Sequence, residues 1–506
     1  MSVLSIDYST QLHYLWALLP EVVLSIGAMV VLLVDVFQRE DRGGPSSPLV
    51  FWLTVGFTLA TAVANGWLLT VEEVVPTGMI AVDAFRVFSN YIFLLAVVLF
   101  LMMSGRYLDE ERLRSGELYA LILFATVGMM VFAGARDLMV VFIGLELMSV
   151  PIYVLTGVNR RDPRAAEGAL KYFLMGAFSS AFFLFGVALV YGGTGTTNIA
   201  LIGLTLGPEG LGSNALVVLG VAMLVVGFGF KVAAVPFHMW TPDAYEGAPT
   251  PVTALMAAAV KAAAFAAFLR VFLTAFPGIY GVWDALAIWL AVLTMIAANL
   301  VALVEGNVKR MLAYSSIAHA GYLLVALAAA TITGAASFLF YLVVYTLMTM
   351  GAFAVVMVVG RRGEAHLDLE DYAGLGWSRP LLGVVMTIFL LSLAGFPFTG
   401  GFIGKVYILQ AAVGRGLVWL AVVLVMTSLI SYYYYLRVAW YMWFRDGEPA
   451  VDEGIVVSTG TRVALIAAAG LVVLLGIFPG ELLELAERSA ASLFRQPGAL
   501  AGPLGF

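Results

Sequence analysis

The sequence predicts an all-α membrane protein that crosses the bilayer many times. Hydrophobic residues make up 62% of the 506 residues and charged residues 11%, whereas soluble chains have about 45–50% and about 25%. The apolar residues form continuous stretches of about 20 residues, as spanning helices require, and do not alternate with polar residues as in a membrane barrel. These observations exclude a soluble enzyme, and the net charge of −6 offers no basic face for nucleic acid.

Fourteen apolar stretches are long enough to cross the hydrocarbon core as helices. They are 15–37, 49–70, 84–105, 116–135, 137–157, 165–191, 214–240, 249–275, 282–304, 307–328, 331–360, 380–412, 416–444 and 461–483. As one straight helix the stretch 380–412 would be about 50 Å long, which is too long for the hydrocarbon core. A break is therefore expected inside it.

Basic residues in the loops predict the orientation of the chain. Of the 26 Lys and Arg residues, fifteen lie in loops after odd-numbered spans, and five lie after even-numbered spans or in the C-terminal tail. By the positive-inside rule the odd-numbered loops are cytoplasmic, so both termini are expected on the outer side of a bacterial inner (plasma) membrane. The loop 363–380 is then expected to be a solvated cytoplasmic segment.

Six basic residues are left inside the predicted spans after the fifteen and the five counted in loops, and Glu146 is singled out with them, because a charge at the bilayer centre costs about 2.5–3.5 kcal/mol. They are Glu146, Lys171, Lys231, Lys261, Arg270, Lys405 and Arg437. The two arginines lie toward span ends and are expected to extend to the interface. Lys171 lies about two turns into its span, so interfacial and functional roles are equally open. The other four have no easy route to water, and we interpret them as functional, with a purely structural buried ion pair as the alternative.

The buried lysines suit proton transfer. Removing an ammonium from water favours its neutral form, and a nearby carboxylate favours its charged form. Glu146 beside a lysine would therefore act as a switch, and a row of such groups would form a proton relay through the membrane. His238 and His319 can pass protons near neutral pH, although a structural role as a satisfied buried histidine is equally open for each.

Helix breakers accompany two of these lysines. Pro236 follows Lys231 by five residues, and Pro397 precedes Lys405 by eight within a glycine-rich stretch. Ordinary proline kinks or packing glycines are the alternative reading. The two prolines are 161 residues apart, which corresponds to about five spans. Because five is an odd number, equivalent spans would cross the membrane in opposite directions, and this predicts two inverted repeats, spans 4–8 and 9–13. The expected division is 1–110, 111–275, 276–445 and 446–506.

Several of these stretches resemble the antiporter-like membrane subunits of respiratory NADH-quinone oxidoreductase (complex I). They are "FIGLELMSVPIYVL", "ALKYFLMGAFSSAFFLFGVALVYG", "GFGFKVAAVPFHMWTPDAYEGAPTPV", "KRMLAYSSIAHAGYLLVAL" and "FIGKVYIL". The lysine in the last of these is similar to that of subunit N, the counterpart of mitochondrial subunit 2. The resemblance implies fourteen helices, inverted five-helix repeats, and broken seventh and twelfth helices.

The resemblance also implies roles for individual residues. Glu146 would pair with Lys231, Lys261 would stand on the central hydrophilic axis, and Lys405 would face the outer exit. Lys171 matches a further lysine of subunit N. The implied function is proton translocation coupled to electron transfer from NADH to quinone in partner subunits, which include neighbouring antiporter-like and small membrane subunits.

No cofactor is expected in this chain; NADH, FMN, iron–sulfur clusters and quinone are expected in partner subunits. The absence of cysteine excludes an iron–sulfur cluster or thiolate zinc site here. Three alternatives stay open. They are a subunit of a sodium/proton antiporter or membrane-bound hydrogenase of the same superfamily, a structural spacer, and a haem or quinone anchor using His238 and His319.

Overall fold

The computed structural model describes residues 14–42, 47–71, 78–207, 214–360, 362–446 and 457–494. Over these ranges the chain forms helices and three isolated β-bridges, without a strand, so the predicted all-α fold is confirmed. The longer helices are α2 (Leu19–Arg42), α3 (Pro48–Trp67), α4 (Ala84–Glu110), α5 (Gly116–Gly134), α6 (Leu138–Thr156), α7 (Pro163–Thr194), α9 (Ala215–Lys231), α12 (Lys261–Ala275), α13 (Tyr280–Val304), α14 (Val308–Ala329), α15 (Ile332–Gly360), α17 (Pro380–Ala394), α18 (Gly400–Gly414), α19 (Val418–Phe444), α20 (Thr459–Ile477) and α21 (Gly480–Ala491). Short helices include α8 (Ile199–Thr205), α10 (Thr241–Gly247), α11 (Thr250–Leu255) and α16 (Leu375–Ser378).

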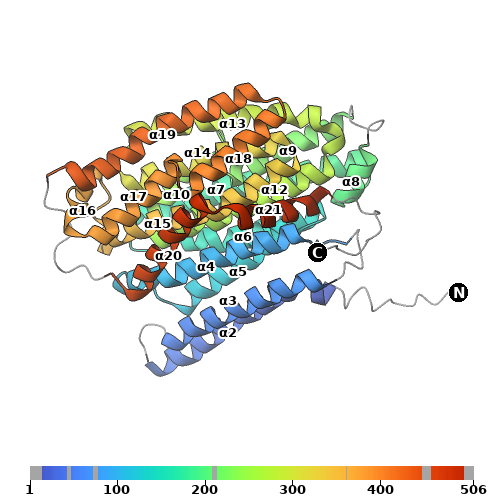
Figure 1. Ribbon diagram of the computed structural model, residues 1–506. Helices are drawn as coiled ribbons and strands as arrows, with labels where there is room; N and C mark the ends of the chain where they lie inside the picture. The colour runs from blue at the N-terminus through green and yellow to red at the C-terminus, as the bar shows by residue number, and fades with distance from the viewer. Residues whose placement is uncertain are drawn as a thin grey trace.

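The long helices run side by side in one bundle. Figure 1 shows the pair α2 and α3 along one edge, and α13 with α19 along the opposite edge. The interior is formed by the segment Thr250–Ala275, which is buried throughout its most apolar window, and by α14 and α15. These central helices carry several of the predicted site residues.

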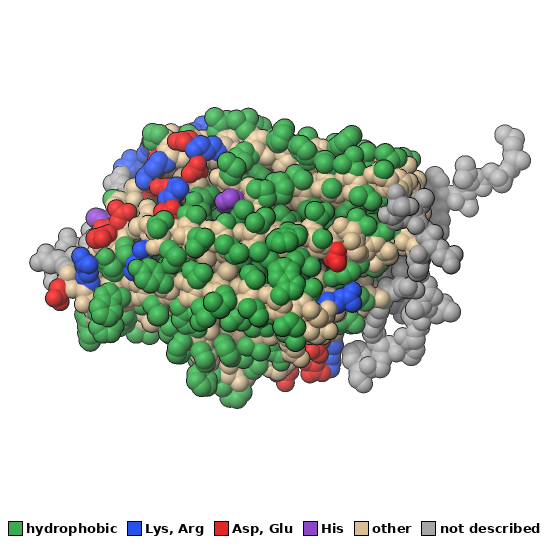
Figure 2. Space-filling model, turned by 90° about the horizontal axis from the view of Figure 1, so that it is seen from above, with side chains coloured by type: hydrophobic (Ala, Val, Ile, Leu, Met, Phe, Trp, Pro, Cys, Tyr) green, Lys and Arg blue, Asp and Glu red, His purple; other side chains and the backbone are tan. Residues whose placement is uncertain are grey.

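The outer surface of the bundle is suited to lipid. Large apolar side chains such as Phe178, Trp289 and Tyr433 are exposed. Figure 2 shows hydrophobic side chains covering most of one face, with charged side chains gathered mainly toward one end. An exposed apolar area of this extent has no place in water, so the chain is a multi-pass membrane protein.

Twelve helices in the described ranges are long and apolar enough to cross a membrane, and up to thirteen if one strongly bent helix pair counts as a span. Our fourteen predicted spans include those twelve, and the other two are the spans in which breaks were expected. Helix α9 has 17 residues, and α17 and α18 have 15 each. Helices of this length reach only about 22–26 Å, less than the hydrocarbon thickness of about 30 Å.

Both predicted breaks are present, and their local geometry explains them. Helix α9 ends at Lys231, and the chain makes turns from Val232 to Trp240 before α10. Helix α17 ends at Ala394 because Gly395 adopts a left-handed conformation with φ of +89°. Helix α18 then begins at Gly400. A third irregularity was not predicted: the π-helical turn η2 (Met256–Val260) lies between α11 and α12.

The C-terminal region differs from our expectation. The predicted span 461–483 ends earlier, because α20 stops at Ile477, just before Pro479, and α21 begins at Gly480. The Ser492 hydroxyl accepts a hydrogen bond from the backbone N–H of Phe85, while the Tyr14 hydroxyl accepts one from Met79. Both described chain ends therefore lie at the same end of the bundle.

Candidate functional site

Lys231 lies at the last turn of α9, directly before the first break. Its side chain is 3% exposed, and its Nζ donates to Ser149 Oγ at 2.6 Å and to the Tyr153 hydroxyl at 3.2 Å. Ser149 and Tyr153 are one turn apart on the same face of α6. The ammonium also lies 5.2–5.6 Å from the ring centroids of Tyr153, Tyr172 and Phe230. The cation is thus held by two hydroxyls, by aromatic faces and by the helix C-terminus.

Glu146 lies one turn before Ser149 on α6, but it is not the immediate partner of Lys231. Its Oε1 accepts a hydrogen bond from the Ser180 hydroxyl of α7, and no ion pair joins it to Lys231. The direct contact that we expected is replaced by Ser149, whose short side chain stands on the face of α6 toward the lysine. The carboxylate still acts on Lys231 through its charge. The two groups are therefore coupled across a hydroxyl.

Lys261 begins α12 directly after the π-helical turn, at the centre of the bundle. Its side chain is 2% exposed, and its Nζ donates to the Ser316 carbonyl at 2.6 Å and to the Ser316 hydroxyl. Both acceptors are neutral, so this ammonium has no carboxylate partner. A π-bulge changes the direction of the side chains that follow it and is frequent at functional sites.

His319 follows Ser316 by three residues on α14 and is 1% exposed. Its two ring nitrogens form hydrogen bonds with the hydroxyls of Tyr341 and Tyr435, and the Tyr435 hydroxyl also bonds to Ser315. Lys261 contacts Ser316 and Lys405 lies over the ring of Tyr322, which stand on α14 three residues before and three residues after His319. Along α14, His319 therefore lies between the residues that contact these two lysines.

Lys405 lies on α18, five residues after the second break. Its Nζ donates to the carbonyls of Leu393 at 3.0 Å and Ala394 at 2.8 Å, which are the last residues of α17. The ammonium also lies 4.7 Å from the centroid of the Tyr322 ring. The broken helix thus presents two carbonyls that have no helical partner, and the lysine satisfies them.

Gly395 adjusts the backbone at this break to the position of Lys405. A Cβ at Gly395 would lie 3.0 Å from Lys405 Cδ and 3.3 Å from its Nζ. We expect Gly395→Ala to displace the ammonium and so to lower the ion transport that the sequence predicts, in addition to about 1–2 kcal/mol of backbone strain. Gly416→Ala is the matched control, because Gly416 has a similar φ of +83° but nothing within 4 Å. Equal transport in the two variants, at equal thermal stability, would contradict this role.

Lys171 and His238 do not join the buried group. The Lys171 side chain is 44% exposed, and its Nζ forms ion pairs with Glu167 at 2.7 Å and Asp243 at 2.6 Å. Asp243 also contacts Arg310 at 3.3 Å. His238 is half-buried in the turns after α9, and its Nδ1 has no hydrogen-bond partner among the described residues. Both residues therefore lie outside the group of buried lysines.

Two buried ion pairs near the start of α4 were missed by sequence reasoning. Arg270 was expected to extend to the interface, but it is 4% exposed and its guanidinium pairs with Asp83 at 2.7 and 2.9 Å. Arg86 is fully buried and contacts Glu21 at 2.6 Å. The loop before α4 folds over the helix ends and supplies Asp83, which hydropathy cannot foresee. The sequence signal that could have indicated these pairs is Asp83 directly before the apolar span 84–105, which itself contains Arg86.

Asp83 is strongly acidic because of its surroundings. Burial alone would raise its pKa, but the charge and hydrogen bonds of Arg270, together with the charge of Arg136, outweigh burial and lower the pKa to about 2. These two pairs connect α2 and the start of α4 to α12, the helix that carries Lys261.

Glu364 was expected in a solvated loop, but its side chain is only 12% exposed and lies at a junction of four segments. It accepts hydrogen bonds from Lys309 Nζ at 2.6 Å, from the Tyr107 hydroxyl at 2.6 Å, and from the backbone N–H and hydroxyl of Thr250 at 2.7 and 2.6 Å. Burial would raise the pKa of Glu364, but the Lys309 charge and these hydrogen bonds hold the pKa below its usual range.

The pKa of Glu364 predicts a pH dependence of stability. Because the folded-state pKa is depressed, its contribution is fully present above the ordinary value of 4.5 and is lost as pH falls through the folded-state pKa. We expect Glu364→Gln to lower the free energy of unfolding at pH 7, and the difference from the unmodified chain to shrink in acid. Thermal unfolding of both proteins, from pH 7 down to below the ordinary pKa of 4.5, measures this difference in stability. A difference that grows in acid would have the wrong sign.

The site has no metal centre in the described ranges, where no group of three or more His, Asp or Glu side chains could hold an ion. Its defining feature is the set Lys231, Lys261 and Lys405, each 5% exposed or less inside a bundle with an apolar surface. Interior ionisable groups beside two broken helices are typical of the ion-translocating class of multi-pass membrane proteins.

Comparison with known families agrees with this class. A profile described as "NADH:quinone oxidoreductase/Mrp antiporter, TM" matches residues 135–431, more than half of the chain. The chain therefore belongs to the NADH:quinone oxidoreductase/Mrp antiporter family of membrane proteins.

Relatives along nearly the whole chain carry a more particular name. The "NADH-quinone oxidoreductase subunit N" of Trichlorobacter lovleyi is 48% identical over 474 residues, which cover 93% of this chain and 96% of that protein. The "NADH-quinone oxidoreductase subunit N 1" of Sorangium cellulosum is 44% identical over 497 residues, which cover 94% of this chain and 98% of that protein. The resemblance to antiporter-like complex I subunits is thus confirmed.

Solved structures share the fold. A chain of respiratory complex I from Thermus thermophilus with bound aureothin is 36% identical, with a TM-score of 0.76 over 92% of this chain and 99% of that chain. A chain of the Mrp complex from Dietzia sp. DQ12-45-1b has a TM-score of 0.81 at 22% identity, over 95% and 98% of the two chains, and shows the fold alone.

Proposed function

We propose that this chain is a proton-translocating membrane subunit of an NADH:quinone oxidoreductase. The observation that carries the proposal is the burial of three lysine ammoniums inside a multi-pass bundle, in a chain that is 44–48% identical to proteins named subunit N. In this assignment the complex is an enzyme, and this subunit carries no redox chemistry of its own. NADH, flavin, iron–sulfur clusters and quinone would bind in partner subunits.

The proposed path begins at Glu146 and Lys231 and ends at Lys405. From Lys231, the rings of Tyr172 and Trp240 stack at 4.1 Å, and Tyr245 follows at 6.1 Å from Trp240. Tyr245 interacts with Ser316, whose two oxygens accept from Lys261. These contacts place the first two lysines along one row of side chains; ring faces do not carry protons, so water between the rings would carry the proton from Lys231 to Lys261.

The second half of the path is formed by hydrogen-bonded side chains. Ser316 is adjacent to Ser315, which bonds to Tyr435, and Tyr435 bonds to His319. A nearby chain runs from Tyr434 through Asn299 to Tyr322, whose ring faces Lys405. Each hydroxyl or imidazole can accept a proton from one neighbour and donate one to the next.

Buried hydroxyls mark where water would complete the route. Those of Thr241, Tyr345 and Thr349 have no hydrogen-bond partner among the described residues. Buried polar groups of this kind are usually satisfied by ordered water, which also conducts protons. We therefore place the water-filled part of the path beside Tyr345 and Ser316, next to Lys261.

Loading of the path would depend on Ser149. Because Ser149 stands between Glu146 and Lys231, a movement of α6 against α9 changes how strongly the carboxylate stabilises the ammonium. Neighbouring subunits of the complex would supply such a movement. We assign Lys171 and His238 to the edge of this path, outside the group of buried lysines. We also propose that the chain is divided into 1–110, 111–275, 276–445 and 446–506, with two inverted repeats. Both termini would then lie on the outer side of a bacterial inner membrane.

The transported ion decides between this function and that of a sodium/proton antiporter subunit. In vesicles containing the intact complex, we expect NADH oxidation to acidify the lumen in sodium-free buffer, and a protonophore to abolish the gradient. Transport that requires sodium and leaves NADH oxidation unaffected when this chain is removed would favour the antiporter. Visible absorbance of the purified chain would instead indicate a haem anchor.

A further inference from the structure

The corner 246–250 connects α10 to α11 and stands at the start of the central span Thr250–Ala275. Lys309 of α14 closes this corner from one side. It is fully buried, and its Nζ donates to the Glu246 carbonyl at 3.0 Å and to the Ala248 carbonyl at 2.6 Å. These carbonyls lie at the end of α10, where no further helical turn uses them, so the ammonium fixes the end of that helix.

Glu364 closes the same corner from the other side. Its Oε1 accepts from the backbone N–H of Thr250 at 2.7 Å and from the Thr250 hydroxyl at 2.6 Å, and its Oε2 accepts from Lys309 Nζ at 2.6 Å. Thr250 is the first residue of α11, and Pro249 and Pro251 on either side of it have no N–H. The carboxylate therefore holds the one backbone donor at these three positions and joins it to the cation that holds α10.

The backbone at Glu364 is strained. Its φ of +49° follows a φ of +74° at Gly363, and a residue with a Cβ adopts this left-handed conformation rarely. Strain of this kind persists only where the surrounding structure requires it, and it occurs mainly at functional sites. Here the four hydrogen bonds from Lys309, Tyr107 and Thr250 compensate for it. The position of this carboxylate is therefore fixed more tightly than a solvated loop requires.

The pair acts on the lysine path through α14. Lys309 and Ser316 are seven residues apart, so they lie on the same face of α14, about 10 Å from each other along the helix. Lys309 fixes the corner before the central span, and Ser316 accepts from Lys261 farther along that span. One face of α14 therefore determines both where the span begins and which side chain meets Ser316. A shift of the span by one residue would move Lys261 by about 1.5 Å and rotate it by about 100°, away from Ser316.

Tyr245 depends on the same corner. The Thr253 hydroxyl donates to the Tyr245 carbonyl at 2.7 Å, which ties the first turn of α11 back to α10. The side chain of Tyr245 interacts with Ser316, the residue that also accepts from Lys261. Two members of the proposed path, Tyr245 and Lys261, are therefore placed by the geometry of the corner, one before it and one after it.

We propose that Glu364 and Lys309 are positioning residues for proton transfer: their ion pair fixes the corner 246–250 and thereby holds Lys261 against Ser316. This role rests on the proposed function, because it matters for transport only if Lys261 carries the proton. The alternative is an ion pair that only stabilises the fold. The contacts on both sides of one corner, and the strained backbone that makes them, favour positioning.

Backbone hydrogen exchange and proton pumping test the proposal together, on the intact complex in vesicles. Glu364→Gln keeps the shape of the side chain and removes its charge. We expect backbone exchange over residues 250–255 to become about fivefold faster, because hydrogen bonds to a carboxylate are about twice as strong as those to a neutral group. We expect the pumping rate per assembled complex to fall at least about threefold, because displacing a positioned group by about 1 Å costs up to about 100-fold in rate. An ion pair that only stabilises the fold would lower the amount of complex and not the rate per complex.

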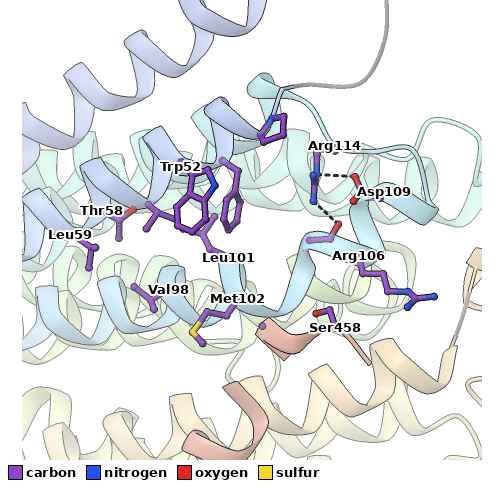
Figure 3. Close-up of a pocket in the computed structure, with 15 residues that line it drawn as sticks. Trp52, Thr58, Leu59, Val98, Leu101, Met102, Arg106, Asp109, Arg114 and Ser458 are labelled. Carbon is purple, nitrogen blue, oxygen red and sulfur yellow. Dashed lines mark hydrogen bonds and ion pairs between the residues drawn. The ribbon is translucent and has the colours of Figure 1, made fainter. Parts of the chain in front are cut away.

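Three further variants serve as controls. Thr250→Val removes one hydrogen bond to Glu364 without leaving an unpaired charge, so it provides the test if Glu364→Gln does not assemble. It should speed exchange about twofold and lower pumping, whereas Thr250→Ser keeps the hydroxyl and should match the unmodified chain. Asp109 lies in the last turn of α4 and pairs with Arg114 at 2.9 Å, beside a pocket whose lining includes no residue of the corner (Figure 3). Asp109→Asn should change neither measurement.

The outcomes separate this proposal from the proposed function. If Lys261→Ala lowers pumping but Glu364→Gln does not, or if exchange over 250–255 stays unchanged, the positioning role is wrong and the proposed function is untouched. If Lys261→Ala leaves pumping unchanged, the proposed function is wrong, and the positioning role falls with it. Equal effects of Thr250→Val and Thr250→Ser would also overturn the proposal.

Discussion

Replacing Lys261 with alanine is expected to lower the rate of NADH-driven proton pumping at least about tenfold, since removing a positioned proton-transfer group costs about 10²–10⁴ in rate. Lys261 lies at the centre of the proposed path, and its ammonium donates to both oxygens of Ser316. The measurement is the proton-to-NADH ratio and the pumping rate in vesicles containing the assembled complex.

A second readout separates loss of transport from loss of folding. Because Ser316 is a neutral partner, Lys261→Ala removes a buried charge without leaving a buried carboxylate unpaired, so thermal stability is expected to hold or rise. Lys171→Ala is the matched control: it makes the same chemical change at a 44% exposed, ion-paired side chain, and we expect less than about a twofold change in pumping. Unchanged pumping in the Lys261 variant would refute the path.

Removing Asp83 is expected to destabilise the protein by about 3–5 kcal/mol, because it leaves the buried Arg270 guanidinium without its carboxylate partner. Arg270 also donates to the Ala133 carbonyl at 2.7 Å, which cannot neutralise its charge. The single change Asp83→Ala should therefore lower the unfolding temperature and the amount of assembled complex.

The double variant Asp83→Ala with Arg270→Met should recover most of this loss, since an apolar side chain of similar length replaces the unpaired cation. The matched control is Asp109→Ala, because Asp109 pairs with Arg114 at 2.9 Å but its side chain is 51% exposed. That change is expected to cost less than about 1 kcal/mol. If the double variant were no more stable than the single one, the ion pair would not be the source of the effect.

The sequence could predict the parts of the fold that depend on hydropathy and on helix breakers. Continuous apolar stretches located the spans, and Pro236 and Pro397 located both breaks, because proline removes one helical hydrogen bond and clashes with the preceding turn. The end of the last span was placed too late because Pro479 interrupts an apolar stretch whose hydropathy continues. The π-helical turn before Lys261 leaves no such mark in the sequence.

The site could be predicted as a set of residues but not as a set of contacts. Burial of Lys231, Lys261 and Lys405 followed from their depth in apolar stretches. Their partners did not follow, because hydroxyls and backbone carbonyls such as those of Ser149 and Leu393 occur throughout the chain. The expected Glu146–Lys231 contact is absent for this reason: a neutral serine one turn away is closer to the ammonium.

The central claim is that a continuous polar route joins the three buried lysines. A density map of the assembled complex, at a resolution that shows ordered water, tests it directly. The account predicts ordered waters that contact the hydroxyls of Thr241, Tyr345 and Thr349 and link Lys231 to Lys261 and then to His319 and Lys405. A dry apolar gap between Tyr245 and Ser316, or lysine nitrogens directed to the lipid headgroups, would contradict it.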